Sequence, residues 1–255
     1  MQPRLTHLVT EWISSAQCLL QSLVPHQAPL VIRDALAADE CRWLLVAVER
    51  GLVTFTDCPP GCPRLAKRGA SGPDHFVTPT GAARHMFSGP DKAQPDLNRE
   101  YVPHIGAWAR AVYDFGYEPT STRFSFYRAY SRDLLTKKRG GSYETDVECY
   151  DADQRLVLQI EAKKDQRQVD VLAAQMHRAG YLGALPPGSA KEIEYVLDLE
   201  PRYLWIVGPG SVDPATHVFA VRVEGLDAAF RELTDVPAAG SSTMGATGPQ
   251  GSTRA

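Results

Sequence analysis

The sequence has neither a long apolar run nor a cysteine-rich framework, and both absences limit what kind of protein it encodes. No stretch approaches the ~18 apolar residues that cross a bilayer, and the first residues do not form a continuous apolar signal segment. The five cysteines are an odd number scattered along 255 residues. Because a chain of this length folds without disulfides, we expect reduced thiols and a cytoplasmic protein.

The chain also lacks a strong charge of one sign, since its formal net charge is −3. Nucleic-acid-binding domains are usually basic where they contact phosphate, so this balance argues mildly against such a role. The basic residues are clustered, however. One cluster lies in residues 123–140, where Asp133 is the only acidic residue and the local charge is +5; its basic residues are Arg123, Arg128, Arg132, Lys137, Lys138 and Arg139. A second cluster contains Arg64, Lys67 and Arg68. Each is either a phosphate-binding surface with salt-dependent affinity or a solvated surface.

Several well-known catalytic motifs are absent. No stretch has the spacing of a zinc-peptidase helix (HExxH), a P-loop (GxxxxGK(S/T)) or a hydrolase nucleophile turn (GxSxG). Cys58 and Cys62, even when Cys41 and His75 are added, do not complete a four-ligand zinc set at known spacings. The chemistry must therefore be sought in other residues.

The N-terminal part has the order of helices followed by a hairpin. Apolar residues at helical spacing predict helices over 5–23 and 41–52, and a short helix is expected over 30–36. Strands are predicted at 52–56 and 75–78, on either side of a loop rich in proline and glycine, and a further helix at 82–87.

This order, with the sequences ERGLV at 49–53 and FVTPTG at 76–81, resembles the winged-helix family over residues 5–87. The resemblance implies that the third helix enters the major groove of DNA and that the hairpin loop contacts the backbone or minor groove. The nucleic-acid contacts that it implies are Arg42, Arg50, Arg64, Lys67 and Arg68. A winged-helix module used for protein contacts or dimerisation is the alternative.

A second region follows residues 88–100, which are polar, contain two prolines and are typical of a linker. A helix containing Ile105, Trp108, Ala109 and Val112 comes next, with strands predicted at 122–130, 143–150, 155–162, 203–207 and 217–223 and a helix at 165–178. We therefore expect a domain over 1–87, the linker, and an α/β domain with a mixed sheet over 101–236. Residues 237–255 have almost no apolar anchors and are expected to be disordered.

Acidic residues occur on two consecutive predicted strands of this region. Because strand side chains alternate between faces, Glu144, Asp146 and Glu148 should share one face, opposite Thr145. On the next strand, the side chains that face away from Leu156, Leu158 and Ile160 are Val157, Gln159, Glu161 and Lys163. A short hairpin would then bring Asp146 beside Glu161.

Two neighbouring carboxylates repel each other and have raised pKa values unless a cation lies between them. Mg²⁺ suits this position, because it prefers oxygen ligands and is usually held by one or two carboxylates together with substrate phosphate. Such an ion lowers the pKa of a bound water and neutralises charge in the transition state, and Lys163 would orient or help to deprotonate that water. These residues favour hydrolysis of a phosphodiester. The alternative is a solvated sheet face with ordinary salt bridges.

Asp146, followed on the next strand by Glu161-Ala162-Lys163, resembles the PD-(D/E)xK nuclease superfamily. The restriction-endonuclease-like core of that family, a helix, three strands, a helix and a strand, fits residues 102–208, although Thr145 stands where the family pattern has proline. The resemblance implies catalytic roles for Asp146, Glu161 and Lys163. It also implies that Mg²⁺, which Mn²⁺ could replace, is held by Asp146, Glu161 and the carbonyl of Ala162. Glu144, Glu148 and Gln159 are further candidates.

The implied protein is a metal-dependent nuclease whose partner is nucleic acid, with DNA expected, in restriction, defence or repair. Its phosphate contacts would include Arg132, Lys137, Lys138 and Arg139. Cutting both strands of a duplex would favour a homodimer with two active sites. The alternative is a DNA-binding regulator or assembly factor with a non-catalytic second domain, and the proximity of Asp146 to Glu161 in a structure would help to distinguish the two.

Overall fold

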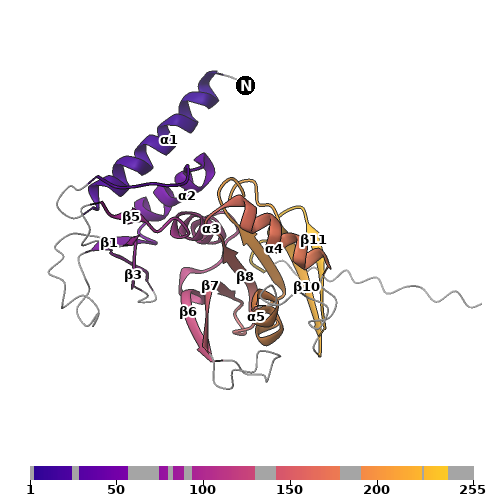
Figure 1. Ribbon diagram of the computed structural model, residues 1–255. Helices are drawn as coiled ribbons and strands as arrows, with labels where there is room; N and C mark the ends of the chain where they lie inside the picture. The colour runs from indigo at the N-terminus through magenta and orange to yellow at the C-terminus, as the bar shows by residue number, and fades with distance from the viewer. Residues whose placement is uncertain are drawn as a thin grey trace, which may run out of the picture.

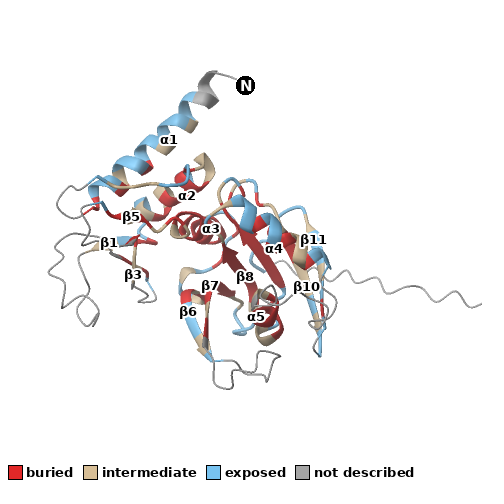
Figure 2. Ribbon diagram, viewed as in Figure 1, coloured by how far each residue is buried: buried red, intermediate tan, exposed pale blue. Residues whose placement is uncertain are grey.

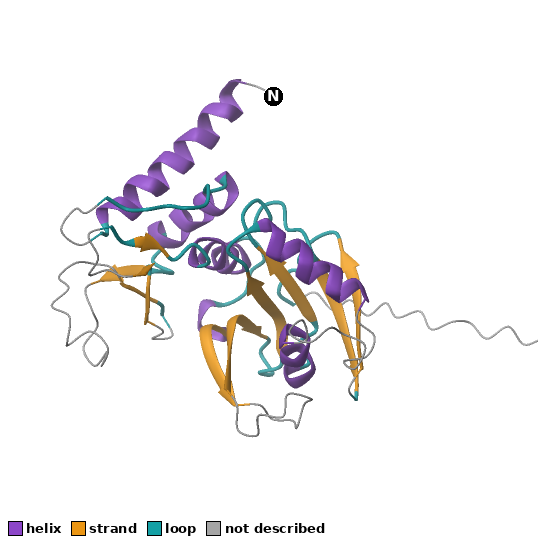
Figure 3. Cartoon of the chain, in the orientation of Figure 1, coloured by secondary structure: helices purple, strands orange, loops and turns teal. Residues whose placement is uncertain are grey.

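The computed structural model describes residues 3–24, 29–56, 75–79, 83–88, 94–129, 142–178, 191–225 and 227–240. Within these ranges the chain forms five α-helices, one large sheet and two small ones (Figure 1, Figure 3). None of the helices in these ranges has the length and apolar character needed to cross a membrane.

The N-terminal part consists of two helices followed by short strands. Helices α1 (Pro3–Ser22) and α2 (Ala38–Glu49) precede an antiparallel sheet of β1 (Thr54–Thr56), β2 (His75–Val77) and β3 (Ala83–His85). Strand β4 (Phe87–Ser88) pairs with β5 (Asp96–Leu97), which lies inside the segment expected to be a linker. The helices predicted over 5–23 and 41–52 and the strands predicted at 52–56 and 75–78 are confirmed as elements.

The predictions of two other helices in this part, over 30–36 and 82–87, are wrong. Residues 83–85 and 87–88 form strands, because β3 pairs in register with β2 and β4 with β5, so the backbone groups are satisfied between strands instead of along a helix. Residues 30–36 are not helical either, since Val31 forms a parallel bridge with Asp96 and its N–H donates to the carbonyl of Pro95 at 3.0 Å. Short apolar runs do not separate helix from strand by periodicity alone.

The C-terminal part is built on a mixed sheet of six strands. They are β6 (Thr122–Ala129), β7 (Ser142–Tyr150), β8 (Leu156–Ala162), β9 (Tyr203–Val207), β10 (Val218–Glu224) and β11 (Asp227–Leu233). Their spatial order is β11-β10-β9-β8-β7-β6, with β8 and β9 parallel and the other neighbours antiparallel. The crossover from β8 to β9 contains α4 (Gln166–Arg178) and α5 (Lys191–Leu199). The expected mixed α/β sheet and its five predicted strands are confirmed, whereas α5 and β11 were not predicted.

Helix α3 (Tyr101–Tyr113) is the centre of the packing. Its residues from Val102 to Val112 are all buried, with α2 on one side and β7 and β8 on another (Figure 1, Figure 2). Gly106 permits the close approach of α2, because a Cβ there would lie 3.3 Å from the carbonyl oxygen of Glu40. One cluster of buried apolar side chains therefore runs from α1 and α2 through α3 to the sheet, and a second lies between α4, α5 and strands β9 to β11.

A buried ion pair joins the segment before α3 to α2. Arg99 donates to both carboxylate oxygens of Glu40, through Nη1 at 2.8 Å, and to the carbonyl of Ala35 at 3.1 Å. The side chain of Glu40 is 0% exposed and that of Arg99 is 6% exposed. Burial raises the pKa of Glu40 to about 7, although Arg99 opposes the shift. Arg99 thus anchors the segment before α3 to α2 and to the residues before α2.

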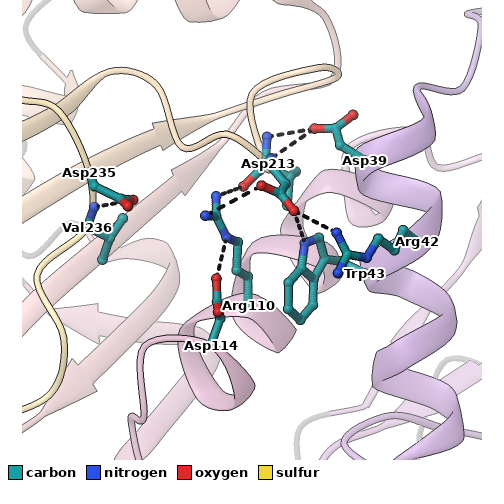
Figure 4. A network of polar contacts seen from close by, with 9 residues as sticks. Asp39, Arg42, Trp43, Arg110, Asp114, Asp213, Asp235 and Val236 are labelled. Carbon is teal, nitrogen blue, oxygen red and sulfur yellow. Dashed lines mark hydrogen bonds and ion pairs between the residues drawn. The ribbon is translucent and has the colours of Figure 1, made fainter. Parts of the chain in front are cut away.

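A polar network attaches α2 and α3 to the connection between β9 and β10 (Figure 4). Asp39 Oδ2 accepts hydrogen bonds from the N–H groups of Val212 at 2.8 Å and Asp213 at 3.2 Å. Asp213 accepts a further bond from Arg42 Nη1 at 3.0 Å, and Arg110 of α3 donates to the carbonyl of Val212. Helix α2 is therefore bonded directly to the β9–β10 connection of the C-terminal part.

The chain after β11 returns to the end of α3. The hydroxyl of Tyr117 donates to the carbonyl of Pro237 at 3.1 Å, and the N–H of Ala239 donates to the carbonyl of Phe115 at 2.8 Å. The start of the tail expected to be disordered is therefore hydrogen-bonded, and residues 241–255 lie outside the described residues.

Candidate active site

Asp146 and Glu161 lie where β7 and β8 separate. The antiparallel pairing of these strands reaches Val147 opposite Ile160 and stops there. One residue further along β7, Asp146 Oδ2 accepts a hydrogen bond of 2.6 Å from the N–H of Ala162, so this side chain replaces the partner that the ladder no longer supplies. If the register of the two strands is continued by one residue, Asp146 lies opposite Glu161. The negative charge of Glu161 helps to raise the pKa of Asp146.

The backbone carbonyl of Ala162 points toward β7, the strand that carries Asp146. The N–H of Lys163 donates to the carbonyl of Val207 on β9 at 2.8 Å, whereas the N–H of Ala162 donates toward β7. Since the N–H and C=O of one strand residue point to the same side, the Ala162 carbonyl faces β7 and Asp146.

Lys163 lies between two carboxylates at the side of a cleft. Its Nζ donates to Glu161 Oε1 at 2.6 Å and to Glu192 Oε1 at 3.1 Å. Glu192 belongs to the first turn of α5, a helix that the sequence analysis did not predict, and this carboxylate was therefore missed. The cleft has a volume of about 720 Å³, and its lining includes Glu100, Lys163, Lys164, Arg167, Gln168 and Glu192.

The pKa of Asp146 is raised well above its ordinary value. Burial is the main cause, and the carboxylates of Glu161 and Glu100 add to it, while Lys163 and the N–H of Ala162 oppose it without cancelling it. The negative charge around Asp146 therefore exceeds what Lys163 balances, and an added cation would be stabilising. Glu100, immediately before α3, is a second carboxylate that the sequence analysis missed.

Lys163 is held in its charged form. Burial favours the neutral amine, but the carboxylates of Glu161, Glu192 and Asp146 outweigh burial and raise the pKa of Nζ. A protonated amine has no lone pair with which to accept a proton near neutral pH. The arrangement therefore suits Lys163 as a cation and hydrogen-bond donor, and not as the base that deprotonates water.

His104 of α3 contacts the backbone at Asp146. Its ring is 1% exposed, forms a hydrogen bond with the backbone of Asp146, and stacks on Phe124 with ring centroids 3.9 Å apart. Burial lowers the pKa of His104 to about 3, so the ring is neutral and positions the strand without adding charge. The helical spacing of α3 did not single out this histidine, because its partner is a backbone group of another element.

The other candidate side chains of the sheet have different surroundings. Glu144 pairs with Arg84 of β3 at 2.9 Å, and the fully buried Glu148 pairs with Arg128 at 2.7 Å. Gln159 is 1% exposed, and its Oε1 accepts no hydrogen bond from the part of the chain that the structure describes. The two glutamates thus pair with arginines, whereas Glu161 pairs with Lys163 and Asp146 accepts a hydrogen bond from the N–H of Ala162.

The alternation of side chains along β7 is interrupted near Asp146. Thr145 Oγ1 donates to Glu148 Oε1 at 2.8 Å, so these two side chains lie together, although the sequence pattern predicted opposite faces. The neighbouring strand is irregular at the matching position, where Ser125 has a φ of +48° and the pairing of β6 with β7 skips it. The predicted faces are wrong here because an unbroken pleat was assumed.

Among the predicted nucleic-acid contacts, Arg42 and Arg50 lie within the described ranges and are exposed. Arg42 pairs with Asp213 at 3.0 Å, and its guanidinium carbon lies 5.4 Å from the ring centroid of Trp12. The guanidinium carbon of Arg50 lies 4.8 Å from the ring centroid of Tyr113. The remaining predicted contacts lie outside the described residues; they are Arg64, Lys67, Arg68, Arg132, Lys137, Lys138 and Arg139. Cys58 and Cys62 also lie outside the described residues.

Comparison with known proteins adds no assignment. No protein-family model, curated protein or solved structure matches this chain. The function must therefore be argued from the residues and their arrangement.

Proposed function

We propose that the protein is a divalent-metal-dependent nuclease with Asp146, Glu161 and Lys163 at its active centre. The observation that carries this proposal is the meeting of two acidic side chains and a charged lysine where β7 and β8 separate, beside an open cleft. An acid with a purely structural role is expected to pair with a base, as Glu144 does with Arg84. At Asp146, by contrast, burial and then the neighbouring carboxylates raise the pKa beyond what the lysine offsets.

The donor atoms fit Mg²⁺ or Mn²⁺. Within the described ranges, no group of three or more His, Cys, Asp or Glu side chains is arranged to hold a metal ion. The proposed set does not need one, because it uses two carboxylates, from Asp146 and Glu161, and the backbone carbonyl of Ala162, all of them hard oxygen ligands. Positive charge at this point would oppose the burial and the carboxylate repulsion that together raise the pKa of Asp146. When bound, the ion would supply Lewis acidity next to the phosphodiester.

The chain's own side chains would position the substrate and stabilise charge. The ammonium of Lys163 would donate to a phosphate oxygen or to the attacking water and offset the negative charge that develops in the transition state. Its bonds to Glu161 and Glu192 hold it in position before substrate binds. The proton of the attacking water would pass to solvent or to a carboxylate, since Lys163 is already protonated.

The order of elements supports the same proposal. Helix α3, strands β6, β7 and β8, helix α4 and strand β9 follow one another as helix, three strands, helix and strand, the core order of the PD-(D/E)xK superfamily, with α5 as an additional helix. A restriction-endonuclease-like fold is therefore part of the proposal. The support for a winged-helix-like N-terminal part is weaker, because α2 packs on α3 and is bonded to the β9–β10 connection. We assign that part a supporting role in nucleic-acid binding, through the exposed Arg50.

The test is cleavage of plasmid, linear and single-stranded DNA and of RNA, each with Mg²⁺, Mn²⁺ or EDTA. The wild type should cut at least one substrate with metal and none in EDTA, and Glu161→Gln, which keeps the side-chain size and removes its charge, should not cut. Glu224→Gln is the matched control, because Glu224 is an exposed glutamate paired with Arg222 on β10, and this variant should cut like the wild type. Binding of nucleic acid without cleavage under every metal condition would favour the DNA-binding regulator instead.

A further inference from the structure

Strand β6 carries two exposed aromatic rings one strand away from Asp146. Four large apolar side chains are exposed in the described ranges, and two of them are consecutive on β6: Phe126, 39% exposed, and Tyr127, 63% exposed. Strand β6 is the last of the six-stranded sheet, and its outer side carries no further strand in the part that the structure describes. The partners of these two residues on β7 are Thr145 and Glu144, which immediately precede Asp146. Exposed rings on an edge strand suggest a surface that is covered by a partner.

Arginine guanidinium groups lie against both rings. The Cζ atoms of Arg123 and Arg128 lie 4.7 and 5.3 Å from the ring centroid of Phe126, and that of Arg84 lies 5.7 Å from the ring centroid of Tyr127. Arg84 and Arg128 are also paired with carboxylates, whereas Arg123 has no carboxylate partner in the described ranges. Because consecutive side chains of a strand point to opposite faces, the two rings lie on either side of this edge. In the described ranges the edge therefore combines an exposed ring on each side with the positive charge of Arg123.

We infer that this edge of β6 binds the unstacked bases of single-stranded nucleic acid. Surfaces that bind single strands combine aromatic rings, on which bases stack, with cationic groups that attract the phosphates, and arginine contributes to both. A duplex fits poorly, because its base faces are covered by neighbouring bases and only phosphates and groove edges are accessible. The positive charge of Arg123 also favours a polyanion over an apolar peptide strand as the occupant.

The location next to Asp146 gives this surface a role in substrate choice. Neighbouring strands of a sheet lie about 4.8 Å apart, so a nucleotide stacked on Phe126 would have its phosphates close to the β7 residue that the proposed nuclease function makes catalytic. The inference rests on that proposed function for the position of the cut, but not for the stacking itself. It predicts that single strands or frayed ends are preferred over blunt duplex.

Binding in EDTA tests the stacking separately from cleavage. The probes are a fluorescein-labelled oligothymidylate, the same strand annealed to its complement, and an abasic oligomer of equal length that keeps the phosphates and has no bases. The wild type should bind the oligothymidylate most tightly. Phe126→Ala and Tyr127→Ala should each weaken that binding by roughly fivefold or more, the loss expected from removing one stacked base, and should leave the abasic oligomer unchanged. Tyr127→Phe, which keeps the ring, should bind like the wild type.

Leu8→Ala is the matched control, because Leu8 is 38% exposed, as Phe126 is 39% exposed, and lies on α1. Unchanged affinity in both alanine variants, an equal loss for the abasic oligomer, or a change of oligomeric state without a change of affinity would each overturn the inference. Ring-dependent binding without metal-dependent cleavage would leave the stacking surface standing and sink the nuclease proposal. If Glu161→Gln abolishes cleavage but neither alanine variant changes binding or cleavage, the nuclease proposal would stand and the stacking surface would be refuted.

Discussion

Replacing Asp146 by asparagine should stabilise the metal-free protein and abolish cleavage at the same time. Asparagine keeps an oxygen that can accept the 2.6 Å hydrogen bond from the N–H of Ala162, and it removes the charge that faces Glu161 and Glu100. Because the fold raises the pKa of Asp146, the ionised carboxylate makes the folded state less stable at neutral pH. A residue kept for metal binding is expected to show this conflict between stability and activity.

The size of the gain follows from the positions of the charges. Two unit charges about 5 Å apart, the spacing of directly opposed strand residues, repel by roughly 3 kcal/mol at an effective dielectric constant of about 20. Lys163 and the N–H of Ala162 offset part of this repulsion. We therefore expect Asp146→Asn to raise the free energy of unfolding by about 1–2 kcal/mol, and the melting temperature by roughly 2–8 °C, in EDTA.

The gain should depend on pH and on metal. Below the ordinary aspartate pKa of 3.8 the carboxyl group is protonated in both the folded and the unfolded chain, so the wild type and the variant should differ little there. The advantage of the variant should grow as the pH rises above that value and level off once Asp146 ionises in the fold. Saturating Mg²⁺ should favour the wild type, which would gain about 2.7 kcal/mol at a metal concentration 100 times the dissociation constant.

Thermal denaturation followed by circular dichroism, in EDTA and in Mg²⁺ over a range of pH, measures these differences. Glu144→Gln is the matched control on the same strand, because it breaks the pair with Arg84 and should lower the melting temperature in EDTA. A lower melting temperature for Asp146→Asn in EDTA would refute the reasoning, since it would mean that the ionised carboxylate stabilises the fold.

Three further substitutions test the site and its support. Lys163→Ala should abolish cleavage but leave nucleic-acid affinity in EDTA close to wild type, because affinity depends on many phosphate contacts, and gel cleavage with a parallel binding assay decides this. Arg99→Ala should lower the free energy of unfolding in urea by about 3–5 kcal/mol, because it leaves a buried Glu40 without its partner. That loss should be smaller at pH 5, since Glu40 has a pKa near 7 even with the arginine present and would be protonated. Gly106→Val should cost about 1–3 kcal/mol in the same titration by forcing α2 away from α3, with Gly106→Ala closer to wild type.

The sequence predicted the strands of the sheet well, because their patterns are local. The apolar run around Leu158 and Ile160 is buried in β8, and Asp146 lies opposite Glu161 because the hairpin between the strands is short. The predicted faces of β7 failed only where the pleat is interrupted. A side-chain-to-backbone bond between neighbouring strands, such as that from the N–H of Ala162 to Asp146, leaves no trace in residue spacing.

The missing members of the site come from elements that tertiary packing brings together. Glu100 precedes α3, His104 lies within it, and Glu192 begins α5, and none of the three stands at a recognisable distance in sequence from Asp146. The misassigned N-terminal helices have the same origin. Residues 30–36 are extended because Val31 finds a bridging partner in Asp96, more than sixty residues later in the chain.

The burial of α3 on all sides has a consequence for how the molecule unfolds. Because α2 covers one side of this helix and the sheet another, neither half of the chain has a complete core without it. The Glu40–Arg99 pair and the bonds of Asp39 to the β9–β10 connection add polar contacts that also break when the halves part. Calorimetry should therefore record one cooperative transition, and a fragment that begins at residue 101 should expose the apolar side of α3 and associate or aggregate instead of folding as a free nuclease domain.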